Sequence, residues 1–146
     1  MRKLSYKQIL KNREKWEAAL VSGKYKQATH VLHNPETDGY CCLGVAAEVL
    51  GVPRVSKVKE SVSKEIRDYY GKDDAWSVAP FEVRRALGLV DEVGSKRNAS
   101  GDSLTERNDS GQTFEQIANL LKTGNYYMTQ FDMEDPWYID NILKVN

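Results

Sequence analysis

Near the start of the chain, apolar residues recur at the three- to four-residue spacing of an amphipathic helix. Ser5 followed by Gln8 has the pattern of a capping box, and Ser22-Gly23 would end the helix, so a helix is predicted over residues 5–21. Its inner stripe would consist of Ile9, Arg13, Trp16 and Leu20. Lysines and arginines occupy the other faces, which is typical of a solvated helix surface.

Two later segments carry similar helical signals. Pro80 suits a first helical turn and Gly88 suits a C-terminal cap, which predicts a helix over residues 80–89. Thr113 and Gln116 form a second capping-box pattern, and the apolar residues after them predict a helix that ends at Gly124.

The segment Cys42–Leu50 is apolar nearly all round and rich in small residues, and Gly51 and Pro53 follow it. A helix that is apolar on every face must be surrounded by other elements, and small residues let those neighbours approach closely. We therefore expect this helix to be the centre of the core.

Extended structure is predicted just before that helix. The pattern indicates a short β-hairpin. Residues 27–33, which include β-branched types, would form its first strand. Residues 34–39 are dense in turn-forming types, and residues 40–43 would form its second strand. Residues 54–75 keep a helical spacing, but their β-branched content leaves strand or loop open. The polar stretch 90–102 is predicted to be a β-hairpin or a mobile loop.

These elements predict an α+β fold, with about four helices packed around a buried central helix and a small antiparallel β-hairpin sheet. We expect residues 1–124 to form a single compact domain, because no linker divides them. Residues 125–146 are acidic and aromatic, and aromatics this dense are expected to pack on the domain or on a partner.

Composition narrows the functional classes. The 146 residues include 21 Lys and Arg against 21 Asp and Glu, and this neutral balance argues against a protein that coats nucleic acid. No apolar run is long enough to span a membrane, and the N-terminal residues lack the apolar stretch of a signal peptide, so a cytoplasmic protein without a membrane partner is expected.

The charge is unevenly distributed. The first 26 residues are strongly basic, whereas the residues after Gly124 are strongly acidic. The two ends could pair within one molecule, pair between two copies as a homo-oligomer, or face different partners.

Cys41 and Cys42 are adjacent, which excludes an ordinary disulfide framework because sequence neighbours cannot take up its geometry. At the start of a helix, nearby N–H groups would lower a thiol pKa, so Cys42, and less favourably Cys41, is a candidate nucleophile with His30 or His33 as base. Burial as small core residues is the favoured alternative. Zinc binding is not expected, because adjacent cysteines diverge and His30 and His33 would project to opposite sides of a strand. No cofactor motif is present.

A second cluster of polar residues lies just before the last predicted helix. Asn, Asp, Ser and Gly types there favour a structural turn. The functional alternative is an anion or nucleotide site, in which Arg107, Asn108 and Asp109 lie beside the start of the central helix. The candidate ligand-binding residues are then Tyr40, Cys41, Cys42, Arg107, Asn108 and Asp109. In the C-terminal segment, the candidate partner-binding residues are Phe131, Asp132, Glu134, Asp135, Trp137 and Tyr138.

Three motifs in this order carry a resemblance: Tyr40-Cys41-Cys42-Leu43-Gly44-Val45, the 80–89 helix, and Asn108-Asp109-x-Gly111-x-x-Phe114-x-x-Ile117-Ala118. From about Trp16 to Leu121 the chain resembles a group of small proteins from tailed phages and prophages. The resemblance implies a viral gene product acting in the bacterial cytoplasm, and such accessory proteins are often directed at host defence.

The leading hypothesis is therefore a non-catalytic, phage-encoded accessory protein. It would counter host defence by sequestering a nucleotide-derived signal or by blocking a host protein. The alternative from another class is a cysteine hydrolase or transferase that uses Cys42 with His30 or His33. A third hypothesis, DNA binding through the basic first helix, conflicts with the neutral overall charge.

Overall fold

The structure, a computed structural model, describes residues 4–58 and 65–143. Within these ranges the chain forms seven helices and five short strands, which confirms the predicted α+β class. The helices are α1 (Tyr6–Val21), α2 (Cys42–Val49), α3 (Phe81–Leu87), α4 (Leu104–Asp109), α5 (Phe114–Leu121), α6 (Gln130–Met133) and α7 (Pro136–Asn141). The strands are β1 (Lys26–Gln27), β2 (His33–Asn34), β3 (Gly39–Tyr40), β4 (Arg54–Val58) and β5 (Ile66–Tyr70).

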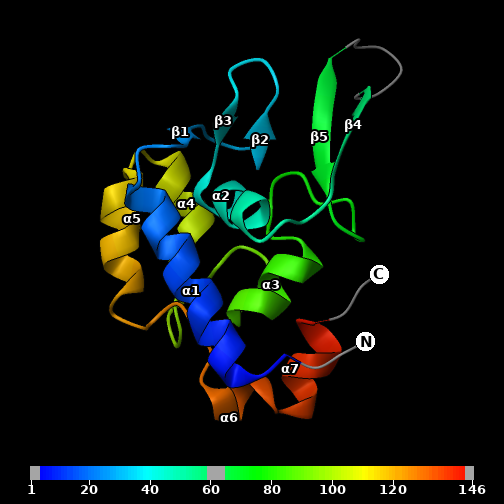
Figure 1. Cartoon of the computed structure of the whole chain (residues 1–146). Coiled ribbons are helices and arrows are strands. Elements are labelled where there is room, and N and C mark those ends of the chain that lie inside the picture. The colour runs from blue at the N-terminus through cyan, green and yellow to red at the C-terminus, as the bar shows by residue number, and fades with distance from the viewer. Residues whose placement is uncertain (1–3, 59–64, 144–146) are drawn as a thin grey trace.

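Helix α2 is the centre of the core, as predicted. Its residues from Cys42 to Ala47 are all buried, and it packs against α1, α3 and α4 (Figure 1). Helix α1 begins after Ser5, whose hydroxyl accepts a hydrogen bond from the backbone N–H of Gln8, and it buries the predicted stripe, including Arg13 and Trp16. The indole of Trp16 donates to the carbonyl of Cys42 at 2.9 Å and so fixes α1 against the start of α2.

The close approach of the chain to α2 depends on Gly44. The backbone of Leu32 crosses the helix there, and a Cβ on residue 44 would lie 1.7 Å from the Leu32 carbonyl oxygen. The same carbonyl accepts a hydrogen bond from the N–H of Cys41 at 3.3 Å. The segment before the hairpin is therefore held on α2 by backbone contact.

The sheet beside α2 differs from the predicted single hairpin. Strand β3 pairs antiparallel with β2, as expected, but it also pairs in parallel with β1. Residues 27–33 are therefore two strand ends separated by a bend rather than one strand. At His30 the bend has a left-handed φ of 69°, which a continuous strand does not allow.

The ambiguous 54–75 segment contains the antiparallel strands β4 and β5, which extend away from the helices (Figure 1). Side chains alternate between the two faces of β5, so Asp68 and Tyr70 are buried while the residue between them is more exposed. Every residue of β4 is exposed. The helical spacing in this segment was misleading because β-branched residues fit a strand equally well.

The remaining elements agree with the prediction in part. Helix α5 has the expected capping box between Thr113 and Gln116, and α3 ends at Gly88 with φ 66°, although Pro80 precedes α3 as its N-cap. The predicted turn before α5 is largely helix α4, because Ser103 caps a turn of helix there. Residues 90–102 form turns, with one bridge between Ser95 and Ser103.

The C-terminal segment folds back on the domain. Tyr126, Tyr127 and Tyr138 are buried, and α6 and α7 lie beside the start of α1 (Figure 1). Buried Arg13 stabilises this junction: its guanidinium donates to the carbonyls of Leu87 at 2.7 Å and Met128 at 2.9 Å and lies 4.2 Å from the Tyr127 ring centroid.

The close approach at Gly44 gives a test of the core. In an exposed helix, replacing glycine by alanine stabilises by about 1 kcal/mol. At residue 44 we expect the same replacement to destabilise the fold, because the new methyl group would displace the Leu32 backbone. Gly44→Ala should lower the free energy of unfolding by about 2 kcal/mol or more in urea titrations. Ala18→Gly, on the exposed face of α1, measures the propensity effect alone, and a Gly44→Ala protein as stable as the parent would contradict the packing.

Candidate functional site

The predicted Cys41-Cys42 pair lies at the start of α2, inside the core. Cys41 is the N-cap residue, and its sulfur accepts a hydrogen bond from the N–H of Gly44 at 3.4 Å. The thiol of Cys42 donates to the carbonyl of Leu104 at 3.7 Å. Both side chains are buried, and both thiols are free.

The environment of these thiols opposes activation. Burial raises the pKa of Cys41 to about 11, and this effect outweighs the backbone N–H groups of Gly44 and Leu43, which lower it. Burial also raises the pKa of Cys42 well above its usual value. The helix start therefore does not produce the thiolate that the nucleophile hypothesis requires, because desolvation is the stronger influence.

The two histidines are directed at carboxylates. His30 is an exposed residue whose Nδ1 lies 3.2 Å from a carboxylate oxygen of Asp109, and its backbone N–H donates to the other oxygen at 2.8 Å. His33 lies between Asp68 and Asp38. Among the described residues no hydrogen bond joins either histidine to a cysteine, so the thiol–imidazole pair of a cysteine hydrolase is not assembled.

Asn108 is the residue that connects the two predicted polar clusters. It is fully buried at the end of α4, and its carbonyl oxygen accepts hydrogen bonds from the N–H of Cys42 at 3.1 Å and from Gln27 at 3.0 Å. Its amide group donates to the carbonyl of Ala28 at 2.8 Å. Asn108 therefore lies beside the start of α2, but its hydrogen-bonding groups are occupied within the chain.

Other predicted ligand residues are also engaged internally. Arg107 makes two parallel hydrogen bonds to Asp102, at 2.7 and 2.8 Å. Tyr40 is buried, with its ring 4.5 Å from that of His33 and its hydroxyl accepting from Arg54 at 3.5 Å. Each of the six predicted ligand-binding residues is thus bonded within the chain, and Cys41, Cys42 and Asn108 are buried together at the start of α2, which we call the Cys41–Asn108 clamp.

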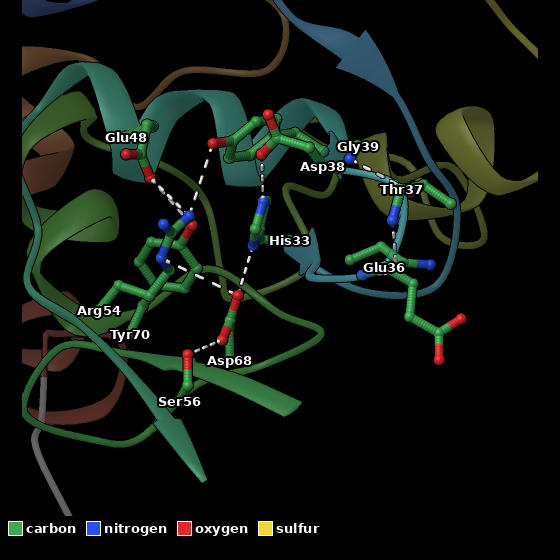
Figure 2. A network of polar contacts seen from close by, with 12 residues as sticks. His33, Glu36, Thr37, Asp38, Gly39, Glu48, Arg54, Ser56, Asp68 and Tyr70 are labelled. Carbon is green, nitrogen blue, oxygen red and sulfur yellow. Dashed lines mark hydrogen bonds and ion pairs between the residues drawn. The ribbon is translucent and has the colours of Figure 1, made fainter. Parts of the chain in front are cut away.

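A polar network that the sequence pattern did not predict lies between the two sheets (Figure 2). His33 Nδ1 bonds to Asp68 and its Nε2 to Asp38, the latter at 2.8 Å, while the hydroxyl of Ser56 donates to Asp68. Arg54 lies 3.9 Å from the same Asp68 carboxylate. Only the register of β4 and β5 brings Ser56 opposite Asp68, so the sequence carried no local signal of this network.

The network holds the β4–β5 hairpin to the domain. Burial raises the pKa of Asp68, but hydrogen bonds from Ser56 and His33 outweigh burial, so the net pKa is lowered and the carboxylate is ionised. Ser56 donates to Asp68 and not to His33, and this orientation does not activate the hydroxyl as a nucleophile.

In the described ranges no group of three or more His, Cys, Asp or Glu side chains could hold a metal ion.

The predicted partner-binding residues of the C-terminal segment lie partly in the core and partly on the surface. Tyr138 is only 2% exposed, and its hydroxyl donates to the carbonyl of Leu89, so it is a core residue. Phe131 and Trp137 are 83% and 64% exposed. Asp135 caps α7 through the N–H of Trp137, and Asp132 lies 3.6 Å from Arg97. Among described residues, no ion pair joins the acids of this segment to the cations of α1.

A groove of about 640 Å³ lies where the start of α1 meets α3, α6 and α7. Its apolar and aromatic lining consists of Leu4, Tyr6, Ile9, Met133, Tyr138, Ile139 and Leu143, and Ser5 and Gln130 are its uncharged polar residues. Arg85 on α3 and Glu134 after α6 add one charge of each sign. Tyr138 and Glu134 were predicted as partner-binding residues, but the groove itself was not predicted, because it depends on how four helices pack.

The buried thiols lead to a labelling prediction. Native protein treated with iodoacetamide at about pH 8, below an ordinary thiol pKa, should stay unmodified at Cys41 and Cys42 because neither thiol is accessible or ionised. The same protein in urea should be modified at both positions, as mass spectrometry of the intact chain would show. Rapid labelling of one native thiol would restore the nucleophile hypothesis.

The Arg107–Asp102 pair leads to a prediction about pH. Hydrogen bonds from Arg107 lower the pKa of Asp102 to about 2. A carboxyl pKa that is lower in the folded chain means that the pair stabilises the fold above about pH 4 and loses that contribution as the pH falls through about 2. In NMR titrations of side-chain carboxyl carbons, Arg107→Gln should raise the pKa of Asp102 towards about 4.

Lys96→Gln is the matched control, because Lys96 acts on Asp102 through its charge alone. It should shift the titration of Asp102 less than Arg107→Gln does. Equal shifts in the two variants would show that the paired hydrogen bonds are not the cause.

Comparison with known proteins identifies the family. Residues 7–125 match a family model described as a domain of unknown function, DUF8296. No curated protein and no solved structure matches the chain. Within the described ranges, no helix has both the length and the apolar character needed to cross a membrane. Because the match covers well over half of the chain, the protein belongs to the DUF8296 family.

Proposed function

We propose that this is a non-catalytic binding protein that docks a second protein through its C-terminal segment. The observation that carries the proposal is the exposure of two large aromatic side chains, Phe131 (83%) and Trp137 (64%), on adjacent short helices. Trp and other large aromatics are common anchors of protein interfaces, where burial on binding removes their apolar surface from water.

The charge around these aromatics indicates the chemistry of the partner. Asp132, Glu134, Asp135 and Asp140 belong to the same segment. Carboxylates at the rim of an interface steer a positively charged partner and disfavour an acidic one. The exposed Phe131 and Trp137 together with these four acids, all within residues 131–140, are called the aromatic-acidic surface below, and this combination fits an apolar patch bordered by lysines and arginines.

A protein partner is preferred to a nucleotide at the Cys41–Asn108 clamp. The polar groups that would have to contact a nucleotide there are Asn108, Arg107 and Asp109, and each already bonds within the chain. Displacing the bonds of Asn108 would leave buried donors and acceptors unpaired, which opposes ligand binding there.

The resemblance to small tailed-phage proteins adds a biological setting to the proposal. A phage-encoded accessory protein in the bacterial cytoplasm would use the aromatic-acidic surface to block a host protein, in keeping with a counter-defence role. The family description assigns no function, so the setting rests on the sequence motifs and the mechanism rests on the exposed surface.

The test is quantitative capture from a bacterial lysate. Phe131→Ser combined with Trp137→Ser should abolish retention of a specific basic protein, because both anchors are removed while the buried Tyr138 is kept. Retention by the parent protein should fall as salt is raised, since the acids act through screened charge. Mass spectrometry identifies the retained protein, and binding is then measured with that purified partner.

Val55→Ser combined with Val58→Ser is the matched control, because these exposed apolar residues lie on β4, away from the C-terminal segment. The control protein should bind the partner as the parent does. If the aromatic double variant also bound normally, or if no protein were retained in a salt-sensitive manner, the proposed function would be wrong.

A further inference from the structure

The groove between α1, α3, α6 and α7 has features of a small-molecule site. Its volume of about 640 Å³ lies within the range of about 300–1,000 Å³ that is common for ligand pockets. Its lining is mainly apolar, with few polar groups, which is also typical of such pockets. Phe131 and Trp137, the two aromatic anchors of the aromatic-acidic surface, do not line it, although Glu134 belongs to both.

Arg85 is the positively charged side chain in the described lining of the groove. It projects from α3 into the groove lining and is half-buried, yet within residues 4–58 and 65–143 its guanidinium has no hydrogen-bond, ion-pair or ring partner. The neighbouring Arg84 is different: it bonds to Asp73 at 3.1 Å and to the carbonyl of Ala79 at 2.7 Å. A partly desolvated guanidinium beside apolar side chains favours an anion, and a carboxylate matches its paired N–H donors.

The other charged groups near the groove neither pair with Arg85 nor offer a second cation to a ligand. Glu134 also lines the groove, but it is exposed to solvent, and no ion pair between it and Arg85 is present. Buried Arg13 has its donors directed at the carbonyls of Leu87 and Met128. Among the described residues that line the groove, Arg85 is therefore the cation available to a ligand.

We propose that the groove binds a small amphiphile with one carboxylate and an aliphatic chain. The carboxylate bonds to Arg85, and the chain lies against Ile9, Met133 and Ile139, where it is removed from water. A medium-chain fatty acid has this chemistry. The ligand would also fasten α6 and α7 to α1 and α3, because the groove is lined by residues of all four helices.

The experiment is calorimetry with three probes of equal chain length: decanoate, decanol and decylamine, each below its aggregation concentration. Decanoate should bind most tightly and decylamine most weakly. Arg85→Gln should weaken decanoate binding about tenfold through loss of the charged hydrogen bonds. The affinity for decanol should stay unchanged in this variant, which also shows that the groove remains folded.

Two further variants complete the test. Lys122→Gln removes an exposed cation at the end of α5 and should leave all three affinities unchanged. Ile139→Trp fills the groove from a half-exposed position and should weaken decanoate and decanol alike. The proposal is overturned if decanoate gives no binding heat, if decylamine binds as tightly as decanoate, or if Arg85→Gln and Lys122→Gln have equal effects.

Discussion

The fold depends on the hydrogen bonds that the buried Asn108 side chain makes to Cys42, Gln27 and Ala28. Helix α2 is surrounded by protein, so the N–H of Cys42 in its first turn cannot be satisfied by water, and Asn108 supplies the acceptor. The same amide bonds to Gln27 and Ala28, at β1 and just after it, so one side chain joins α2, α4 and the start of the sheet. An apolar residue there would leave several buried groups unpaired at once.

This arrangement explains why the predicted nucleophiles and ligand-binding residues are occupied by contacts within the chain. Cysteines suit the start of α2 because they are small enough for the close packing that Gly44 permits, and the same packing removes their thiols from water. Arg107 and Asp109 are engaged by Asp102 and His30 beside the clamp. The two proposed binding sites, the aromatic-acidic surface and the groove that contains Arg85, therefore do not include Asn108 or the residues bonded to it.

Local signals in the sequence were sufficient where a helix depends on its own residues. The Thr113–Gln116 capping box and the apolar segment after Cys42 predicted α5 and α2, because caps and all-round burial are encoded within one turn or one helix. Strands β4 and β5 were not predicted with certainty over helix, since the exposed Val55, Val58 and Ile66 keep a helical spacing and the pairing of Ser56 with Asp68 is set by register. The groove was missed for the same reason: Arg85 is unremarkable on α3 until α6 and α7 pack beside it.

The C-terminal segment combines structural and binding roles within a few residues, which limits how its function can be tested. Tyr126, Tyr127 and Tyr138 belong to the core, and Tyr127 donates to Glu17 of α1 at 2.8 Å. Deleting residues 125–146 would therefore expose the junction around Arg13, and loss of binding would follow from damage to the fold alone. Trp137 immediately precedes Tyr138 yet is largely exposed, so point substitutions can separate the two roles that a deletion merges.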